Sequence, residues 1–309
     1  MKKVLNSKEH QNIVRTILKD WNLEKSEIHF IRASQNFIYL IIFEDEKYIL
    51  RLTPMGNKER IQLEIDFVNY LHQNGLSVNV PIRSADSSFI NRHTMFNYSI
   101  QAVLFHYIEG THYESDKLSD EQLMEWGKEL AILHNHARQF KGGFKNPWSF
   151  IKNVENKLPR DDMHLKNKWE QMKICLMSIT SELETCFIHF DFELDNLLWQ
   201  DGCIHIIDFE SYQYSWLVGD IAYAARDIAD QPAAFDQFLK GYSKERLLSD
   251  LELKAIPIFQ HLHFFYLYGV IRNSVDLDPT LNHCEWINNL IKKLQLMEND
   301  IKEIILKYD

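Results

Sequence analysis

The sequence predicts an α+β fold in which a small β-rich part precedes a larger, mostly helical part. Runs of β-branched and aromatic residues are concentrated in the first third of the chain. In the remainder, apolar residues recur mainly at helical spacing, and one strand-like stretch, residues 197–207, interrupts them. We therefore expect a lobe of residues 1–105, a connecting segment 106–110 and a helical lobe of residues 111–309.

The first lobe is expected to be a small, sheet-rich unit with one inserted helix, which follows a helix-like start of the chain. Apolar residues repeat at helical spacing over residues 7–20, and a second helix is expected over residues 57–74, where Ile61 and Leu71 share one face. Strand-like runs occupy residues 37–43, 47–52, 80–82, 88–90 and 98–105. Three acidic residues separate the first two runs, so we expect those runs to form a hairpin.

The second lobe is expected to be built from helices. The first of these, over residues 119–139, opens with Ser119 and Gln122 in the spacing of a capping box. Further helical patterns cover residues 161–184, 218–230, 233–248, 250–271 and 284–307. The strand-like interruption carries Asp201-Gly202 between two β-rich runs, which predicts a tight hairpin.

The composition argues against several classes of protein. The formal net charge is −10, whereas a nucleic-acid-binding protein usually carries a basic patch, so we expect no nucleic-acid partner. No apolar run reaches the roughly 18 residues that a membrane span needs, and the basic start lacks the apolar core of a secretion signal. The four cysteines form no CxxC pair that would indicate a zinc or redox site. We expect a soluble, cytoplasmic protein whose oligomeric state the sequence does not indicate.

The strongest functional signal is the stretch FIHFDFELDN at residues 187–196. It places His189, Asp191 and Asn196 directly before the predicted hairpin, and Asp208 follows the hairpin. Because a hairpin turns the chain back, we expect Asn196, Asp208 and Asp191 to converge. Carboxylate and amide oxygens are hard ligands that suit Mg²⁺. The competing interpretation is an ordinary polar turn, which does not need so many charges.

The residues around this stretch resemble the aminoglycoside phosphotransferase and choline kinase family. Its members read H-G-D-x-x-x-x-N-x-L, then a short hairpin, then I-D-F-[DE], then a glycine and D-x-A. The corresponding stretch here is HFDFELDNLLWQDGCIHIIDFESYQYSWLVGDIAY. Upstream, GKELAILHNH (127–136) is similar to the family's G-x-x-L-A-x-L-H helix, and VLFHYIEG (103–110) to its lobe-joining segment. The resemblance runs from about residue 30 to 245 and implies a bilobal, protein-kinase-like fold that binds ATP in a cleft.

The resemblance implies a role for each polar residue of the loop. Asp191 would accept the proton of the attacking hydroxyl, while His189 would support the loop. Asn196 and Asp208 would hold Mg²⁺ on the nucleotide phosphates. ATP and Mg²⁺ are therefore the expected cofactors.

The resemblance also implies the contacts to the nucleotide. Arg51 falls where the family has a phosphate-contacting Lys or Arg, and Glu64 falls where a helix glutamate pairs with that cation. The alternative is a pair of unrelated surface charges. The adenine would meet backbone groups around His106 and Ile108.

The sequence departs from the kinase pattern in the loop over the phosphates. Ser34, Gln35 and Asn36 stand where protein kinases carry glycines. We expect Ser34 and Asn36 to contact phosphate through small polar groups. Phe190 replaces the glycine that usually follows the histidine.

The acceptor is expected to be a small amine-bearing alcohol, such as an aminoglycoside-like antibiotic or an amino-alcohol metabolite, because the chain is acidic. The candidate substrate contacts are Glu193, Glu210 and Trp216. For Glu193 a solvated turn is an equal alternative, and for Trp216 a core position is the favoured interpretation.

We predict an ATP- and Mg²⁺-dependent phosphotransferase with an alcohol group as acceptor. A protein kinase fits less well, because no A-P-E segment follows Asp208. A catalytically inactive kinase-fold protein that binds a nucleotide or another ligand is the alternative, and the missing glycines favour it.

Overall fold

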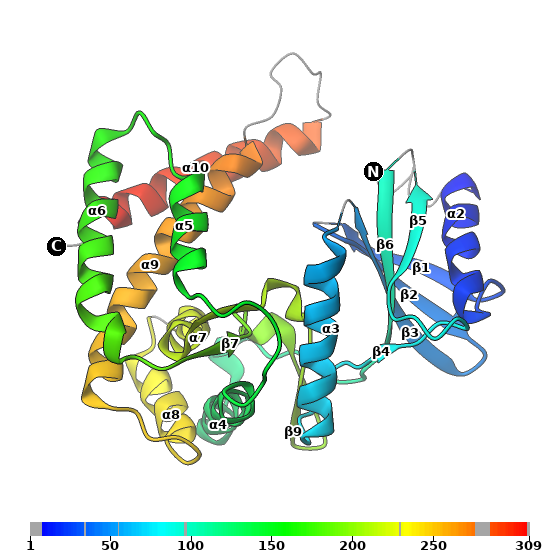
Figure 1. Ribbon diagram of the computed structural model, residues 1–309, viewed down its shortest axis with the longest axis horizontal. Coiled ribbons are helices and arrows are strands. Elements are labelled where there is room, and N and C mark those ends of the chain that lie inside the picture. Colours follow the sequence, from blue (N-terminus) through cyan, green and yellow to red (C-terminus); the bar gives the residue numbers. More distant parts are fainter. Residues whose placement is uncertain are drawn as a thin grey trace. The chain divides into compact units, whose positions relative to one another are not determined.

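The computed structural model describes residues 8–33, 35–54, 56–95, 98–228, 230–275 and 285–307. These residues form two compact units (Figure 1). The first unit comprises the chain up to Tyr113, Phe140–Gly143 and Leu194–Glu210, and the second comprises Glu114–Gln139, Phe144–Glu193 and the chain from Ser211 onward. A sheet dominates the first unit and helices dominate the second, so the predicted α+β class is confirmed. The expected boundary at residues 106–110 stays a prediction.

The first unit is built on an antiparallel sheet. Its strands are β1 (Glu27–Ala33), β2 (Phe37–Phe43), β3 (Glu46–Pro54), β4 (Pro81–Ile82), β5 (Asn91–Met95) and β6 (Tyr98–His106). They are ordered β1-β2-β3-β6-β4, and β5 also pairs with β6. The unit further contains α2 (Lys8–Leu18), the 3₁₀ turns Lys19–Trp21 and Leu194–Asn196, α3 (Lys58–Gln73), β8 (Leu197–Gln200) and β9 (Cys203–Ile206).

The two helices cover opposite faces of this sheet (Figure 1). Successive side chains of a strand point to opposite faces. Leu50 and Leu52 of β3 are fully buried in a cluster with Leu18 of α2. On the other face, Val103 of β6 is buried in a cluster with Ile61 of α3. This second face also carries the polar residues discussed below.

The predicted hairpin is confirmed as β8 and β9. Leu197 pairs with Ile206, and two residues connect the strands. Asp201 and Gly202 have φ of 52° and 79°. A type I′ turn needs positive φ at both central residues, which an aspartate tolerates and a glycine adopts without strain.

The second unit contains most of the helices. They are α4 (Asp120–Ala137), α5 (Trp148–Lys157), α6 (Met163–Ile179), α7 (Leu217–Ala224), α8 (Pro232–Tyr242), α9 (Asp250–Val275) and α10 (Glu285–Lys307). Two short strands, β7 (Thr185–Ile188) and β10 (Gln213–Trp216), pair with each other. Ser119 caps α4, and the predicted capping box with Gln122 is confirmed. No helix among the described residues is long and apolar enough to cross a membrane.

Helices α4 and α8 approach each other very closely. A Cβ atom on Gly127 of α4 would lie 1.9 Å from the carbonyl oxygen of Phe238, and one on Gly241 of α8 would lie 1.8 Å from that of Met124. The rings of Trp126 and Phe238 pack edge to face beside this crossing. Only glycines therefore fit at the two points where the backbones meet.

Two expectations about the strands were wrong, and one strand was not predicted. Residues 88–90 are not a strand, because the backbone turns at Ser87 (φ 62°) and the strand that follows is β5. The hairpin is not the only strand pair after residue 118, since β7 and β10 also pair. No element was predicted for the segment 27–33, which forms β1.

Candidate active site

A cavity of about 290 Å³ lies in the first unit against the α3-facing side of the sheet. Apolar side chains from the sheet and from the β8–β9 hairpin form part of its wall, namely Ile38, Ile49, Phe105, Leu198 and Ile207. Polar side chains also line it, namely Arg32, Arg51, Glu64, Asn79, His106, His112, Asp195, Asn196 and Asp208. The lining thus includes six residues predicted from the sequence, namely Arg51, Glu64, His106, Ile108, Asn196 and Asp208.

Arg51 and Glu64 form a bidentate ion pair. Both distances, from Nη1 to Oε1 and from Nη2 to Oε2, are 2.8 Å. The two side chains are only 6% and 4% exposed. The predicted pairing is therefore present in the structure, and the alternative of two unrelated surface charges is excluded. The contribution of the pair to nucleotide binding stays a prediction.

Arg51 keeps one unused donor. Its Nε atom is buried and has no hydrogen-bond partner among the described residues. Burial alone would lower the pKa of Arg51, but the carboxylates of Glu64, Asp208 and Glu210 raise it above the usual value. The side chain is therefore a permanent cation with one N–H that a bound anion could accept.

The hairpin brings Asn196 next to the segment that holds Asp208. The N–H of Ile207 donates to the backbone oxygen of Asn196 at 3.0 Å, which closes the open end of the hairpin. Asp208 has φ of 63°, a left-handed conformation that non-glycine residues rarely adopt. Nη2 of Arg32 contacts Oδ2 of Asp208 at 2.5 Å. Asp208 is thus paired with a cation that sequence reasoning did not identify.

Asn36 and Glu210 contact each other rather than the cavity. The Asn36 side-chain amide donates to a carboxylate oxygen of Glu210, and Arg60 of α3 donates to the backbone oxygen of Glu210 at 3.0 Å. Burial, and then the charge of Asp208, raises the pKa of Glu210 to about 7. Neither Asn36 nor Glu210 lines the cavity. Ser34, the other residue predicted to contact phosphate, lies outside the described residues.

In the connecting segment 106–110, two backbone N–H groups already donate hydrogen bonds within the protein. The N–H of His106 donates to the oxygen of Val80 at 3.1 Å, and that of Tyr107 donates to the oxygen of Lys47 at 3.3 Å. Both residues and Ile108 line the cavity. The His106 N–H is therefore already paired and is not available to a ligand.

Gly110 fixes this segment against the hairpin. A Cβ atom on Gly110 would lie 2.9 Å from Cβ of Leu198 and 3.1 Å from the oxygen of Trp199. Thr111 exchanges two backbone hydrogen bonds with Trp199, at 2.9 and 3.0 Å. The glycine thus lets the segment and the hairpin form one wall of the cavity.

The catalytic-loop candidates His189 and Asp191 belong to the second unit. His189 follows β7 and is fully buried, and its Nδ1 accepts the N–H of Asp191 at 3.3 Å. The imidazole therefore contacts the backbone of the loop, and its supporting role stays a prediction. Asp191 is half-buried. Its convergence with Asn196 and Asp208 stays a prediction.

Phe190 holds the loop in an unusual conformation. Its φ is 69°, which costs a bulky L-residue of order 1–3 kcal/mol. The ring is buried against Phe150, Tyr223 and Tyr266, with centroid distances of 4.9, 4.5 and 4.9 Å. This aromatic packing offsets the strain and explains how a phenylalanine occupies a position where the family has glycine.

Asp220 of α7 binds the backbone of the same loop. Its Oδ2 accepts the N–H of His189 at 2.8 Å, and its Oδ1 accepts the N–H of Phe190 at 2.6 Å. The carboxylate is completely buried. Two charge-assisted hydrogen bonds therefore fix the backbone directly before Asp191.

Two residues predicted to contact substrate have other partners. Glu193 forms an ion pair with Arg226, so its charge is already compensated. Trp216 is 1% exposed, its ring packs against Phe259, and its Nε1 donates to the oxygen of Thr180 at 3.3 Å. The side chain of Trp216 thus fills the core of the second unit, the position that the sequence favours, and its burial does not support a place in the wall of a substrate pocket.

The donor set suits a cation that is shared with a ligand. Among the described residues, no group of three or more His, Cys, Asp and Glu side chains could hold a metal ion alone. Asn196 and Asp208 supply one amide oxygen and one carboxylate to the same cavity. Mg²⁺ commonly binds through one or two carboxylates, with phosphate oxygens and waters completing its shell. The residues present therefore fit such an ion.

Most of this chain matches one protein family and a curated relative. A family model described as "Phosphotransferase enzyme family" matches residues 27–252. The amicoumacin kinase of Bacillus subtilis (strain 168) is 21% identical over 282 residues, which are 84% of this chain and 83% of that protein.

Solved structures share the fold along nearly the whole chain. An amicoumacin kinase in complex with AMP-PNP, Ca²⁺ and Ami superimposes with a TM-score of 0.82 at 19% identity, covering 99% of this chain and 95% of that one. A microcompartment-associated aminopropanol kinase superimposes with a TM-score of 0.72 at 18% identity, covering 92% and 94%. The predicted kinase-like fold is therefore confirmed.

Proposed function

This chain belongs to the phosphotransferase enzyme family, and we propose that it transfers the γ-phosphate of ATP to a hydroxyl group of a small molecule. The observation that carries the proposal is the cavity wall, where a buried cation, an amide and a carboxylate lie together as Arg51, Asn196 and Asp208. Phosphoryl transfer depends mainly on positioning and on neutralising charge, which is the chemistry that such a wall can supply.

Asp191 is the proposed catalytic residue. It would orient the acceptor hydroxyl and take its proton. The loop around it is preorganised, because Asp220 binds the N–H groups of His189 and Phe190 and because Nδ1 of His189 accepts the N–H of Asp191. A fixed carboxylate is what proton abstraction within hydrogen-bond reach requires.

Asn196 and Asp208 would hold Mg²⁺. When bound, the ion neutralises the charge that develops on the phosphates during transfer. Arg32 contacts Asp208 directly, so binding of the ion requires Arg32 to move aside or to share the carboxylate.

Arg51, which lines the cavity, would contact the phosphates, while Glu64 holds the two Nη atoms of its guanidinium. Ile108 would meet the adenine through its backbone, with His106 beside it. Ser34 and Asn36 would cover the phosphates. The amide of Asn36 contacts Glu210, so Asn36 has to release Glu210 to do so.

The acceptor is proposed to be an amine-bearing alcohol. The names of similar proteins support this class, because they include an aminopropanol kinase and a choline kinase from Streptococcus pneumoniae. Glu193 does not support it, since Arg226 already neutralises its charge. Glu210 keeps a carboxyl group near Asp208 but faces Asn36.

The alternative is an inactive kinase-fold protein that binds a nucleotide or another ligand. The glycine-free loop and the contact between Arg32 and Asp208 favour it. Retention of Asp191, Asn196 and Asp208 in one chain favours the enzyme.

The test is Mg²⁺-dependent ADP formation from ATP across a panel of amino alcohols and aminoglycosides. We expect ADP formation that requires one acceptor class and that falls by about 10²–10⁴-fold in Asp191→Asn. Asp201→Asn, in the exposed turn of the hairpin, is the matched control and should keep wild-type activity. Mg²⁺-dependent nucleotide binding without transfer to any acceptor would establish the inactive alternative, and absence of both would reject the nucleotide site.

A further inference from the structure

Asp220, which binds the catalytic loop, receives a third hydrogen bond from His134 of α4. Nε2 of His134 lies 3.2 Å from Oδ2 of Asp220. Both side chains are 0% exposed. A buried carboxylate is costly unless donors surround it, so this contact helps to keep Asp220 charged and oriented.

The chemistry of the partners assigns the proton on His134. A carboxylate only accepts hydrogen bonds, so Nε2 of His134 must carry the proton that faces Asp220. Burial lowers the pKa of His134, so the ring is neutral and its Nδ1 is an acceptor. The hydroxyl of Tyr242 lies 2.8 Å from Nδ1 and therefore donates to it.

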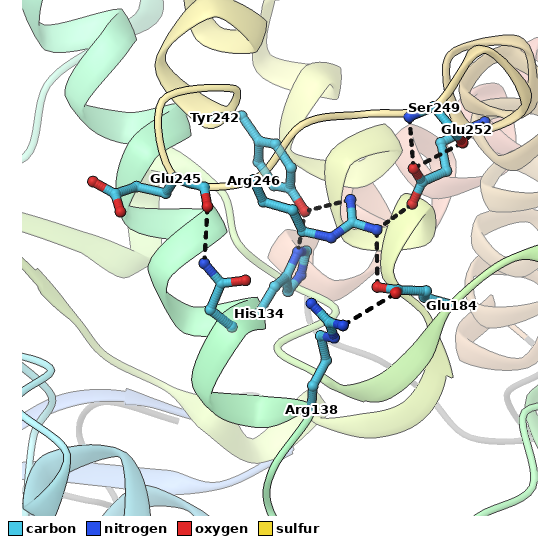
Figure 2. A network of polar contacts seen from close by, with 9 residues as sticks. His134, Arg138, Glu184, Tyr242, Glu245, Arg246, Ser249 and Glu252 are labelled. Carbon is cyan, nitrogen blue, oxygen red and sulfur yellow. Dashed lines mark hydrogen bonds and ion pairs between the residues drawn. The ribbon is translucent and has the colours of Figure 1, made fainter.

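The hydrogen-bond chain begins at a fixed cation (Figure 2). The Tyr242 hydroxyl gives its proton to the bond with His134, so its oxygen accepts a hydrogen bond from Nη1 of Arg246 at 3.5 Å. Nη2 of the same arginine pairs with Glu184 at 3.0 Å and with Glu252 at 2.5 Å. Each of these three hydrogen bonds is therefore donated in the same direction, from Arg246 to Tyr242, from Tyr242 to His134 and from His134 to Asp220.

We propose that His134 and Tyr242 are positioning residues for phosphoryl transfer, which fix the catalytic loop through Asp220. The Tyr242 hydroxyl determines which ring nitrogen of His134 faces Asp220. That nitrogen holds the carboxylate which binds the N–H groups of His189 and Phe190. The expected effect on turnover rests on the proposed function. The expected effect on the conformation of the loop does not depend on that function.

The crossing of α4 and α8 explains how these residues meet. Gly127 lies two turns before His134 on α4, and Gly241 directly precedes Tyr242 on α8. The close backbone approach at both glycines brings the two side chains within hydrogen-bond distance.

The first test is Tyr242→Phe, which keeps the ring and removes only the hydroxyl. We expect kcat to fall about five- to tenfold. KM for ATP should stay within about twofold, because the contacts to the nucleotide do not depend on the hydrogen bonds from Arg246 to Asp220. Hydrogen exchange of the loop segment 187–192 should become faster. The matched control is Tyr268→Phe, which removes another buried hydroxyl that bonds an arginine, Arg272, in the same unit.

The second test compares His134→Gln with His134→Leu. A glutamine amide can still donate to Asp220, whereas a leucine cannot. We expect His134→Gln to turn over at least about fivefold faster than His134→Leu and to retain more protection of segment 187–192.

The outcomes separate this inference from the proposed function. If the wild type phosphorylates no acceptor, the proposed function fails. Hydrogen exchange in segment 187–192 still decides whether Tyr242 and His134 fix the loop through Asp220. The inference is overturned if Tyr242→Phe matches Tyr268→Phe in loop exchange and in any measurable kcat. It is also overturned if His134→Gln and His134→Leu behave alike.

Discussion

The ion pair of Arg51 and Glu64 concentrates charge in the interior of the first unit. Breaking a buried pair by removing one partner usually costs about 3–5 kcal/mol, because the other charge remains uncompensated. We therefore expect Arg51→Met to lower the free energy of unfolding by about that amount. The double substitution Arg51→Met with Glu64→Leu should recover most of the loss, since no charge stays buried. Urea unfolding followed by tryptophan fluorescence measures both.

An exposed ion pair in the same unit provides the control. Nζ of Lys47 lies 2.7 Å from Oε1 of Glu109, and the two side chains are 41% and 65% exposed. Solvent screens such a pair, so Lys47→Met should barely move the unfolding midpoint. A double variant that is no more stable than Arg51→Met would contradict the assignment of the loss to an unpaired Glu64.

Individual residues differ in how far the sequence predicts them. Arg51 and Glu64 were predicted because a strand and a helix place them at positions of a known pattern. Arg32 was not, because its partner Asp208 is 176 positions away and nothing nearby marks the arginine. Trp216 was assigned a role from its proximity in sequence to the loop, but only packing decides whether a large ring lines a pocket or fills a core.

Helix packing in the second unit depends on two glycines. Replacing Gly127 by alanine would place a Cβ atom 1.9 Å from a backbone oxygen of α8, so the helices must separate. We expect Gly127→Ala to lower the free energy of unfolding by about 2 kcal/mol or more, at the upper end of what overpacking costs. Gly219→Ala is the control, because a Cβ there would lie 3.5 Å from the nearest atom.

Alanine favours a helix over glycine by about 1 kcal/mol, so Gly219→Ala should be neutral or stabilising. Chemical unfolding of both variants measures the difference. If Gly127→Ala is as stable as Gly219→Ala, the close approach of α4 and α8 is not what requires the glycine.

Elements with strong local signals were predicted and those held by distant partners were not. The hairpin β8–β9 was predicted because Asp201-Gly202 supplies the turn that its strands need. Strands β7 and β10 were missed because each has four residues and their pairing joins segments about 28 positions apart. The segment 88–90 looked apolar enough for a strand, but serines that bond nearby backbone groups turn the chain there.

At the scale of the whole molecule, buried histidines make the folded state sensitive to acid. Burial, and then the charge of Arg226, lowers the pKa of His263 to about 3. Its ring packs against Phe190, Tyr223 and Tyr266. An unfolded histidine has a pKa of about 6.5, so below that pH the unfolded chain binds a proton that the folded chain does not. Stability should therefore be complete above about pH 6.5 and fall as the pH is lowered towards 3.

For His263 alone, this proton costs the fold about 2 kcal/mol at pH 5 relative to neutral pH, since each pH unit below 6.5 is worth roughly 1.4 kcal/mol. His263→Phe keeps an aromatic ring among the same neighbours and removes the titrating group. We expect the loss of stability between pH 7.5 and pH 5 to be about 2 kcal/mol smaller in His263→Phe than in the wild type. His72→Phe, at an exposed position on α3, should keep the wild-type pH dependence. Urea unfolding at the two pH values measures the difference, and equal losses in His263→Phe and the wild type would mean that other groups cause the acid sensitivity.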